Sequence, residues 1–446
     1  VVSRDWRRPF RLGFNMIRTR SQGALSAIDD VLDDIATLGA GGVRQLQSRD
    51  VGWFAIYKGG AYDKSSSYDF SGPDEILKNQ SGIYPIPTLF QVGNVTQGNY
   101  FDATCESAGS HGLFDSTYCK RPYTPSGDKL DVSDSDVASQ VKGYLTTVAS
   151  RYVASGIRHY EIGNEWELQF GHWNIGSWMS WTWSPQSYVD LLALSRRTLQ
   201  KVAPNIRIVL GGLAYVESYE LAQTWLKEIL SRGAGAYLDV INFHFYGSWD
   251  KLKGHIDGLK SILATYNVED KPLWMTEAGS SATNTSQEEQ SKDVVRFFAT
   301  AFCNGVELAN WHTHISSNDG TSNWGGYGVR DADGRRYKSW YTTQLLAQKI
   351  GAAKTCTTVS EGSKHLYVYK FSGSSSSLVG ASAPTRYVVW SDKDNVSYQL
   401  TNLFKSSDGV QTTSVVPSGD GKFTAQSYRG SDSITVSTTP VLVEKL

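Results

Sequence analysis

Residues 158–170 read RHYEIGNEWELQF, and this stretch shows how the chain builds its fold. It reads as a strand leaving a core, yet Glu161, Glu165 and Glu167 lie close together in it around an Asn. Carboxylates resist burial and repel one another, so such a cluster is either solvated or has a task. The stretch therefore predicts a strand that leaves a core and delivers acidic groups to its edge.

The same alternation of a short apolar strand and an amphipathic helix recurs on both sides of this stretch. Each predicted strand is followed by a helix or by room for one, which predicts a closed (β/α)8 TIM barrel, an α/β fold, over residues 1–352. A doubly wound open sheet is the competing arrangement, but no Gly-x-Gly-x-x-Gly follows the first strand. The predicted strands are 10–16, 41–47, 84–91, 158–165, 207–214, 238–247, 271–279 and 306–314.

The pattern changes at residue 353. Strand candidates with alternating apolar residues now follow one another, separated by Gly, Ser and Asp turns, and no helical period is present. We therefore predict a C-terminal antiparallel β-sandwich domain over residues 353–446. Because no Pro- or Ser-rich linker precedes it, we expect it to pack against the barrel.

The composition narrows the classes of partner. The chain has 446 residues, 40% of them hydrophobic and 20% charged, with a formal net charge of −1. This balance gives no broad charged surface for nucleic acid or a membrane, and no apolar run approaches the ~18 residues that span a bilayer. We expect a monomer that binds neither nucleic acid nor membrane.

Cysteines and glycosylation motifs bear on the compartment. Four cysteines allow three disulfide pairings, and four free thiols are the alternative. Pairing between neighbours is the simplest arrangement, and without a Cys-x-x-Cys motif no zinc site is predicted. The start, VVSRDWRRPF, has neither an initiator Met nor an apolar leader, as expected of a processed N-terminus. These features predict a secreted glycoprotein with disulfides Cys105–Cys119 and Cys303–Cys356 and candidate glycosylation sites at Asn79, Asn94, Asn284 and Asn395.

Functional groups of such a barrel lie at the carboxyl ends of its strands. Glu165 ends the fourth predicted strand and Glu277 the seventh, so the two carboxylates face each other across the mouth. Such a pair is the machinery of glycoside hydrolysis, in which one carboxyl is protonated and the other ionised. An apolar wall raises a carboxyl pKa, and Trp166 is the candidate wall. The other rim candidates are Arg44, Gln91, Asn164, His244, Tyr246, Trp311, His312 and His314.

These motifs resemble the retaining (β/α)8 glycoside hydrolases of clan A. The resemblance lies in YEIGNEWE (160–167), HFYG (244–247), LWMTEAG (273–279) and GYGVRDADGRRYKSWYTTQLL (326–346). The overall plan is similar to families 39, 30 and 51, and TEAG looks more like families 5 and 39. Many relatives carry Pro where this chain has Trp166, so the individual family stays open.

The resemblance implies a role for each matching residue. Glu165 would be the general acid/base and Glu277 the nucleophile. Asn164 would bind the sugar, Tyr246 would orient Glu277, and Trp311 would form the floor of a sugar subsite. No cofactor is implied, and the substrate would be a carbohydrate.

Alternatives remain at this level. A transglycosylase would use the same machinery, and a carbohydrate-binding protein without catalysis would keep only the cleft. His244, His312 and His314 could instead ligate a metal, although hydrogen-bonded site histidines are commoner and no metal is predicted. Aromatic residues at 170–183, together with Trp324 and Tyr327, could stack on sugar rings or brace the rim.

Overall fold

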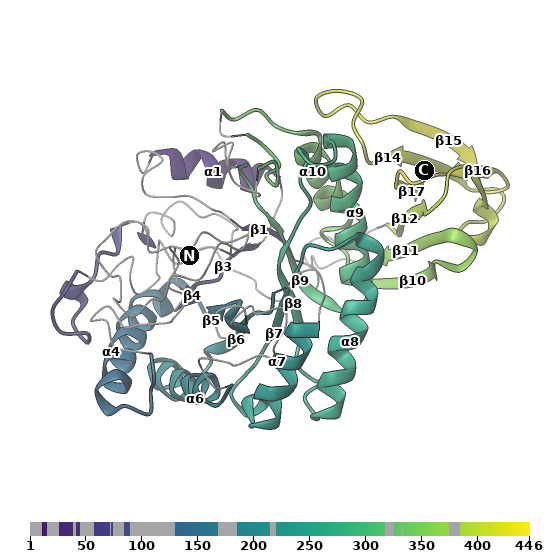
Figure 1. Ribbon diagram of the computed structural model, residues 1–446. Helices are drawn as coiled ribbons and strands as arrows, with labels where there is room; N and C mark the ends of the chain where they lie inside the picture. The colour runs from purple at the N-terminus through teal and green to yellow at the C-terminus, as the bar shows by residue number, and fades with distance from the viewer. Residues whose placement is uncertain are drawn as a thin grey trace.

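The computed structural model describes most of the chain and gives the placement of its elements (Figure 1). Among the helices described, none is both long and apolar enough to cross a membrane. The described residues are 11–15, 26–38, 42–44, 58–71, 73–74, 84–89, 130–167, 185–214, 220–316, 325–331, 333–373 and 384–446.

The first part of the chain alternates parallel strands with helices. The strands are β1 (Arg11–Asn15), β2 (Gly42–Arg44), β3 (Tyr84–Pro85), β4 (Thr88–Leu89), β5 (His159–Asn164), β6 (Arg207–Gly212), β7 (Ile241–Phe245), β8 (Leu273–Ala278) and β9 (Val306–His312). Helices lie around the outside of these strands in Figure 1. They are α1 (Ser26–Thr37), α4 (Ser135–Tyr152), α6 (Pro185–Val202), α7 (Glu220–Ser231), α8 (Leu252–Thr265), α9 (Gln287–Cys303) and α10 (Lys338–Ile350).

Strand pairing follows a circular order among the described residues. β9, β1, β2 and β3 pair in succession, β4 pairs with β5 and β5 with β6, and β7 pairs with β8 and β8 with β9, all in parallel. β3 and β4 are the two halves of segment 84–89, and the bridges Val209–Val240 and Leu213–Phe243 join β6 to the region of β7. The mixed α/β fold is therefore confirmed. The fully closed barrel stays a prediction, with which this order agrees.

Local signals explain where the helices begin. The Ser286 hydroxyl accepts a hydrogen bond from the Glu289 amide at 3.0 Å and caps α9. Asp134 caps α4 by accepting from the amides of Asp136 and Val137. Each cap satisfies amides that have no partner within the helix, which fixes the residue at which the helix begins.

Apolar and polar side chains occupy different levels along the parallel strands. A buried apolar cluster contains residues from five different strand segments: Ile86, Val209, Val240, Trp274 and Leu308. Polar side chains lie further along the same strands, toward their carboxyl ends. The carboxyl ends of the parallel strands therefore carry the polar chemistry, above an apolar base.

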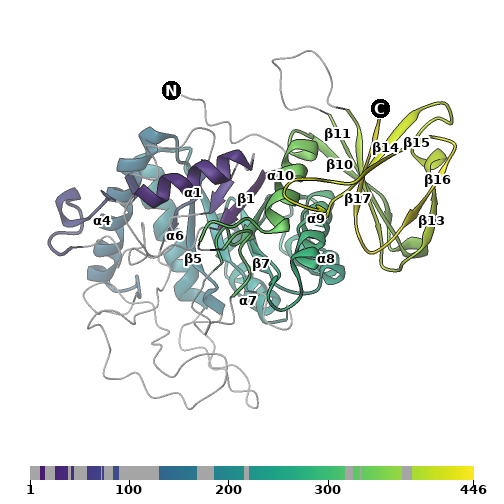
Figure 2. The same cartoon turned by 90° about the horizontal axis from the view of Figure 1, so that it is seen from above.

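Antiparallel strands make up the remainder of the chain (Figure 2). Six of them form one sheet in the order β10-β11-β12-β17-β14-β15, and β13 pairs with β16 in a second sheet. This antiparallel region is consistent with the sandwich prediction. Helix α10 ends at Ile350 and β10 begins at Thr355, and the domain boundary at 352 stays a prediction. The strands are β10 (Thr355–Glu361), β11 (Leu366–Ser372), β12 (Arg386–Ser391), β13 (Val396–Gln399), β14 (Gly409–Ser414), β15 (Ala425–Arg429), β16 (Ser433–Val436) and β17 (Val441–Lys445).

The six-stranded sheet is buried on both faces at its central strands β11 and β12, whereas its edge strands β10 and β15 are mostly exposed. On β11 and β12, Val368 and Val389 pack into a cluster with residues of β13 and β16. Their neighbours Tyr369 and Trp390 face the other way and join the large core that contains the helices of the α/β part. Since successive side chains of a strand point to opposite faces, one strand can serve two cores.

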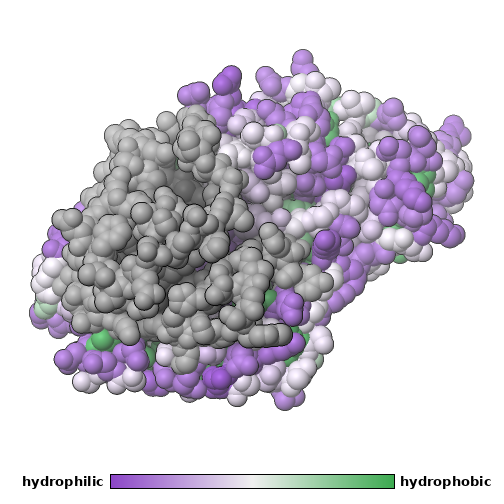
Figure 3. Space-filling model, in the orientation of Figure 1, coloured by the Kyte–Doolittle hydropathy of each residue, from purple (hydrophilic) through white to green (hydrophobic). Residues whose placement is uncertain are grey.

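Covalent and polar links hold the two parts together. A disulfide joins Cys303 at the end of α9 to Cys356 in β10, as the neighbour pairing predicted. The Thr342 hydroxyl of α10 donates to the Val415 carbonyl at 2.7 Å. On the face drawn in Figure 3, the described surface is mostly hydrophilic or intermediate, with isolated hydrophobic spots.

Candidate active site

The end of β5 has an unusual backbone that exposes Glu165. Tyr188 of α6 donates from its hydroxyl to the Ile162 carbonyl at 2.8 Å and accepts from the Gly211 amide at 3.1 Å, so its hydroxyl bridges β5 and β6. Beyond this point Gly163 has φ +86° and Glu165 has φ +47°. A non-glycine residue in the left-handed region is strained, and such strain concentrates at functional sites. The Glu165 side chain is 26% exposed, compared with 8% for Glu277 and 0% for His244.

This backbone turn sends Trp166 away from the rim. The Trp166 residue is 2% exposed, and its ring packs against Tyr188 at a centroid distance of 4.9 Å. A Cβ on Gly163 would lie 2.4 Å from Trp166 Nε1, so the indole folds back over that glycine. The prediction that Trp166 walls the cleft and contacts substrate is therefore wrong in this structure.

An irregularity in the pairing of β7 and β8 places Glu277. Phe243 pairs with Met275, but the next residue, His244, pairs with Glu277 because the register shifts there. Such bulges re-aim a side chain, and here the shift brings Glu277 beside His244. Glu277 is 6% exposed and belongs to the buried edge of the site.

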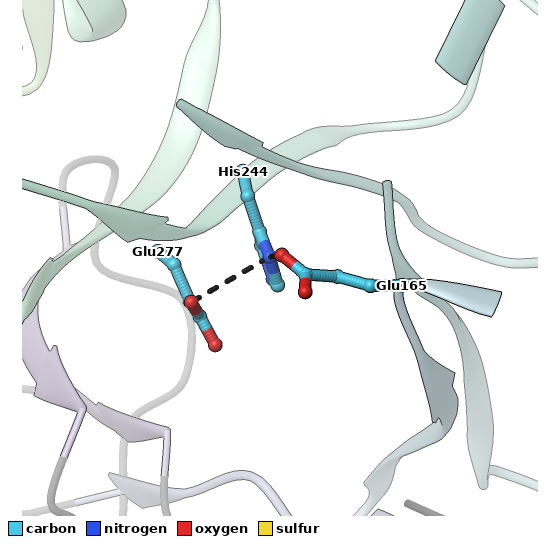
Figure 4. Close-up of side chains that lie close together, drawn as sticks. All are labelled: Glu165, His244 and Glu277. Atoms are coloured by element: carbon cyan, nitrogen blue, oxygen red, sulfur yellow. Dashed lines mark hydrogen bonds and ion pairs between the residues drawn. The ribbon is translucent and has the colours of Figure 1, made fainter. Parts of the chain in front are cut away.

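His244 lies between the two carboxylates (Figure 4). Its Nδ1 is 2.7 Å from Glu165 Oε1 and 3.6 Å from Glu277 Oε2, and its side chain is fully buried. Its Nε2 is 3.3 Å from the Thr276 hydroxyl. A neutral imidazole with its proton on Nδ1 satisfies both contacts, donating to Glu165 and accepting from Thr276. His244, predicted to lie at the rim, is thus the residue that the two glutamates share.

Two further side chains approach Glu277. The Tyr246 hydroxyl donates a hydrogen bond to Glu277 Oε2. His312 Nδ1 is 3.6 Å from the same oxygen, and the His312 ring contacts Tyr246 edge-on with centroids 5.7 Å apart. The predicted position of Tyr246 beside Glu277 is therefore observed.

The other two glutamates of the opening stretch are buried and differ from Glu165. Glu161 is fully buried and accepts hydrogen bonds from Thr88, the Gly212 amide and Asn242 at 2.9–3.1 Å. Glu167 accepts from the Ala214 amide, and its Oε2 has no hydrogen-bond partner among the described residues. Burial raises the pKa of Glu167 to about 8, and the nearby charge of Glu165 contributes. Neither reaches the rim as Glu165 does.

Two residues predicted to bind substrate face elsewhere. Trp311 is fully buried and packs on Phe297 and Phe298 of α9, because its side chain lies on the side of β9 that faces this helix. The His314 ring is also buried, and its Nε2 lies 2.8 Å from Asp34 Oδ2 in α1. These positions correct both predictions. The strand-β9 residue beside Glu277 is His312, which shares its side of the strand with polar Asn310.

The remaining predicted residues are placed only in part. Asn164 ends β5 and is buried next to Glu165, while Arg44 ends β2 with a side chain outside the described part of the structure. Gln91, Cys105, Cys119, Asn79, Asn94 and Trp324 also lie outside the described residues. Asn284 and Asn395 are exposed, and their glycosylation stays a prediction.

Glu165, His244 and Glu277 also have the residue types of a metal site. One ligand atom from each lies within 4.8 Å of the others. However, two ligands about 2.1 Å from a tetrahedral zinc ion are about 3.4 Å apart, and the 2.7 Å between His244 and Glu165 fits a direct hydrogen bond instead. The arrangement therefore favours a hydrogen bond between the two side chains over a shared metal ion.

Comparison with known proteins gives matches among glycoside hydrolases. A family model described as glycosyl hydrolase catalytic core matches residues 169–323, a range that contains Glu277 and begins just after Glu165. No curated protein sequence matches the chain.

Solved structures of glycoside hydrolases share the fold. A family 39 glycoside hydrolase from the gut symbiont Bacteroides cellulosilyticus WH2 has a TM-score of 0.64 and 16% identity, covering 98% of this chain and 81% of its own. A family 39 β-xylosidase from Caulobacter crescentus has a TM-score of 0.60 and 15% identity, with coverages of 98% and 96%. The catalytic domain of a family 30 xylanase C from Talaromyces cellulolyticus has a TM-score of 0.58 and 13% identity, also with coverages of 98% and 96%.

These matches confirm the predicted resemblance to clan A glycoside hydrolases and support that enzyme class for this chain. They do not resolve the family within the clan. Because the solved structures are so distant in sequence, they show a common fold and leave the substrate open.

Proposed function

We propose that this protein is a secreted retaining glycoside hydrolase with a (β/α)8 catalytic barrel, in which Glu165 is the acid/base and Glu277 the nucleophile. The observation that carries the proposal is the separation of the two carboxylates, whose nearest oxygens lie within 4.8 Å. Retaining glycosidases hold their carboxyl groups ~5–5.5 Å apart, whereas inverting ones need ~6.5–9.5 Å to admit a water. The separation supports direct attack on the sugar.

In the first step Glu277 attacks the anomeric carbon as Glu165 gives its proton to the departing glycosidic oxygen. The bond from the anomeric carbon to that oxygen breaks, and a glycosyl ester forms on Glu277. In the second step Glu165 takes a proton from water, whose oxygen displaces Glu277 and restores the carboxylate. Transfer to a second sugar in place of water would make the protein a transglycosylase.

The neighbours of the two carboxylates suit these roles. The hydrogen bond from Tyr246 fixes Glu277 and favours its ionised form. His244 contacts Glu165 through Nδ1 and orients its carboxyl group between the two strands. The greater exposure of Glu165 suits a group that must meet both the leaving group and water.

The proposal is tested with a panel of plant, fungal and bacterial polysaccharides and a matched set of 4-nitrophenyl glycosides. The wild type should release sugar, and Glu277→Gln should not, while Glu228→Gln on the surface of α7 serves as the control. Proton NMR of the first anomer formed should show retention of configuration. Equal behaviour of wild type and Glu277→Gln on every substrate would overturn the proposal.

A second arm separates metal chemistry from carboxylate chemistry. Activity should survive EDTA, and azide should restore turnover of an activated glycoside to Glu277→Ala by replacing the missing nucleophile. Loss of activity in EDTA with recovery on added zinc would instead favour a metal at Glu165, His244 and Glu277. The Cys303–Cys356 disulfide supports an extracellular location, because such bonds persist in oxidising compartments.

A further inference from the structure

Trp311 does not reach the site, but its indole touches a segment that does. Trp311 Nε1 donates to the Tyr327 carbonyl at 3.0 Å, and the Thr313 amide donates to the same oxygen at 3.3 Å. The buried tryptophan is therefore bonded to the backbone of Tyr327, in the segment that follows β9.

A fully buried glutamine fixes the rest of this segment. Gln290 of α9 donates from Nε2 to the carbonyls of Gly326 and Gly328 at 2.8 and 3.2 Å, and its Oε1 accepts from Ser339 at 2.6 Å. The Ser281 hydroxyl donates to the Gly325 carbonyl at 2.6 Å. So many hydrogen bonds to a short stretch of backbone hold its side chains in fixed positions.

The Tyr327 side chain faces the residues around Glu277. Its ring contacts Tyr246 edge-on at a centroid distance of 5.9 Å and His312 at 6.4 Å, the two residues that approach Glu277 Oε2. A Cβ on Gly279, two residues after Glu277, would lie 3.1 Å from Tyr327 Cδ1, so the ring rests on that glycine. Tyr327 remains partly exposed, whereas Trp311 is fully buried.

We propose that Tyr327 is the aromatic residue that contacts the sugar beside Glu277, and that Trp311 is a positioning residue that holds it there. The proposal rests on the proposed glycosidase function and deepens it by naming a specificity-determining residue. An aromatic ring offers an apolar face to a sugar ring, and the phenol adds a hydrogen-bond donor for a hydroxyl or carboxylate group. Burial raises the pKa of Tyr327, which keeps the phenol neutral and able to donate.

The test measures kcat and KM on the 4-nitrophenyl glycoside that the wild type cleaves best. Tyr327→Ala should lower kcat/KM about 10- to 100-fold, mainly through KM, because it removes binding area. Tyr327→Phe removes only the phenol hydroxyl. Its kcat/KM should fall nearly as far as that of Tyr327→Ala if the hydroxyl makes the contact, and should stay near the wild-type value if the ring does. Either result supports the proposal. Tyr428→Ala in the antiparallel part is the matched control and should leave both constants unchanged.

The positioning role is read from a double-mutant cycle. Trp311→Phe keeps the ring packing but removes the hydrogen bond to the Tyr327 carbonyl, so KM should rise about 3- to 10-fold. In the Tyr327→Ala background the same change should add nothing, whereas a general structural defect would add its full effect. Melting temperatures of all variants exclude simple unfolding.

The outcomes separate the two proposals. If the wild type cleaves a glycoside but Tyr327→Ala behaves like Tyr428→Ala, the sugar contact is refuted and the glycosidase function stands. If Trp311→Phe has the same effect with and without Tyr327, the positioning role is refuted. If the wild type cleaves no glycan or glycoside, the proposed function fails and this inference fails with it.

Discussion

A methyl group added at Gly212 should disable the site without touching either glutamate. Gly212 ends β6, and a Cβ there would lie 2.0 Å from His244 Nε2. Ordinary contact begins at 3.4 Å, so Gly212→Ala must displace the imidazole by about 1.4 Å. His244 is fully buried and hydrogen-bonded to Glu165, so the displacement passes directly to the proposed acid/base.

The expected size of the effect follows from that displacement. Moving a catalytic group by about 1 Å can cost about 100-fold in rate, so kcat/KM should fall by at least that factor. Overpacking at a buried site should also cost about 1–3 kcal/mol of stability. Initial rates on the best 4-nitrophenyl glycoside and urea unfolding measure the two quantities separately.

The matched control is Gly254→Ala on the exposed face of α8, where an added Cβ meets no atom within 4 Å. This change should leave activity intact and stabilise the helix by up to about 1 kcal/mol. If Gly212→Ala keeps kcat/KM within about threefold of the wild type while remaining folded, then His244 does not need its observed position. The roles given to the contacts around it would then be wrong.

Tyr246→Phe should lower kcat about 10- to 150-fold, because a hydrogen bond to a charged group contributes about 1.5–3 kcal/mol; the acid limb of the rate profile should move to higher pH, and an unshifted limb would count against the contact with Glu277. Burial lowers the pKa of His255 to about 4. As the pH falls from 6.5 to 4, His255 therefore becomes protonated in the unfolded chain but stays neutral in the folded chain. Stability should decrease by about 3 kcal/mol over that window, and His255→Leu should flatten the curve in urea titrations; an equal slope in both proteins would contradict this. Burial also pushes the pKa of Asp34 upward, but hydrogen bonds from its partners, Arg336 among them, outweigh this and hold it at about 2. Its contribution of about 2 kcal/mol should be present above the unfolded pKa of 3.8 and lost as the pH falls to about 2. Asp34→Asn should cost about 3–5 kcal/mol at neutral pH, and a cost below about 1 kcal/mol would refute the ion pair with Arg336.

The sequence was informative where the signal is local. Apolar periodicity placed the strands of the α/β part to within a few residues. The approach of Glu165 to Glu277 could also be predicted, because the carboxyl ends of parallel strands meet at one edge.

The facing of residues at the strand ends could not be predicted in the same way. β8 shifts its register against both neighbours, and the left-handed Glu165 reverses the chain, so side-chain alternation cannot be extended through these points. Trp166 was misplaced for this reason. A signal did exist in ANWHTH (309–314), because Asn310 and His312 share one parity and Trp311 has the other.

Contacts between residues far apart in the sequence could not be predicted either. His314 is bonded to Asp34, which lies 280 residues earlier in the chain. Nothing in the residues around His314 indicates that an aspartate in the first helix will hold it. Only the assembled fold shows that His314, just after β9, contacts helix α1 and does not face the proposed sugar site.

The six-stranded antiparallel sheet restricts how this protein can be divided. Its Tyr369 and Trp390 belong to the same apolar core as the helices of the α/β part. A truncation after residue 352 would remove one side of that core. The isolated C-terminal fragment would in turn expose Tyr369 and Trp390 to water. The two parts should therefore melt in a single calorimetric transition, and grafting either part onto another enzyme would require redesign of the shared boundary.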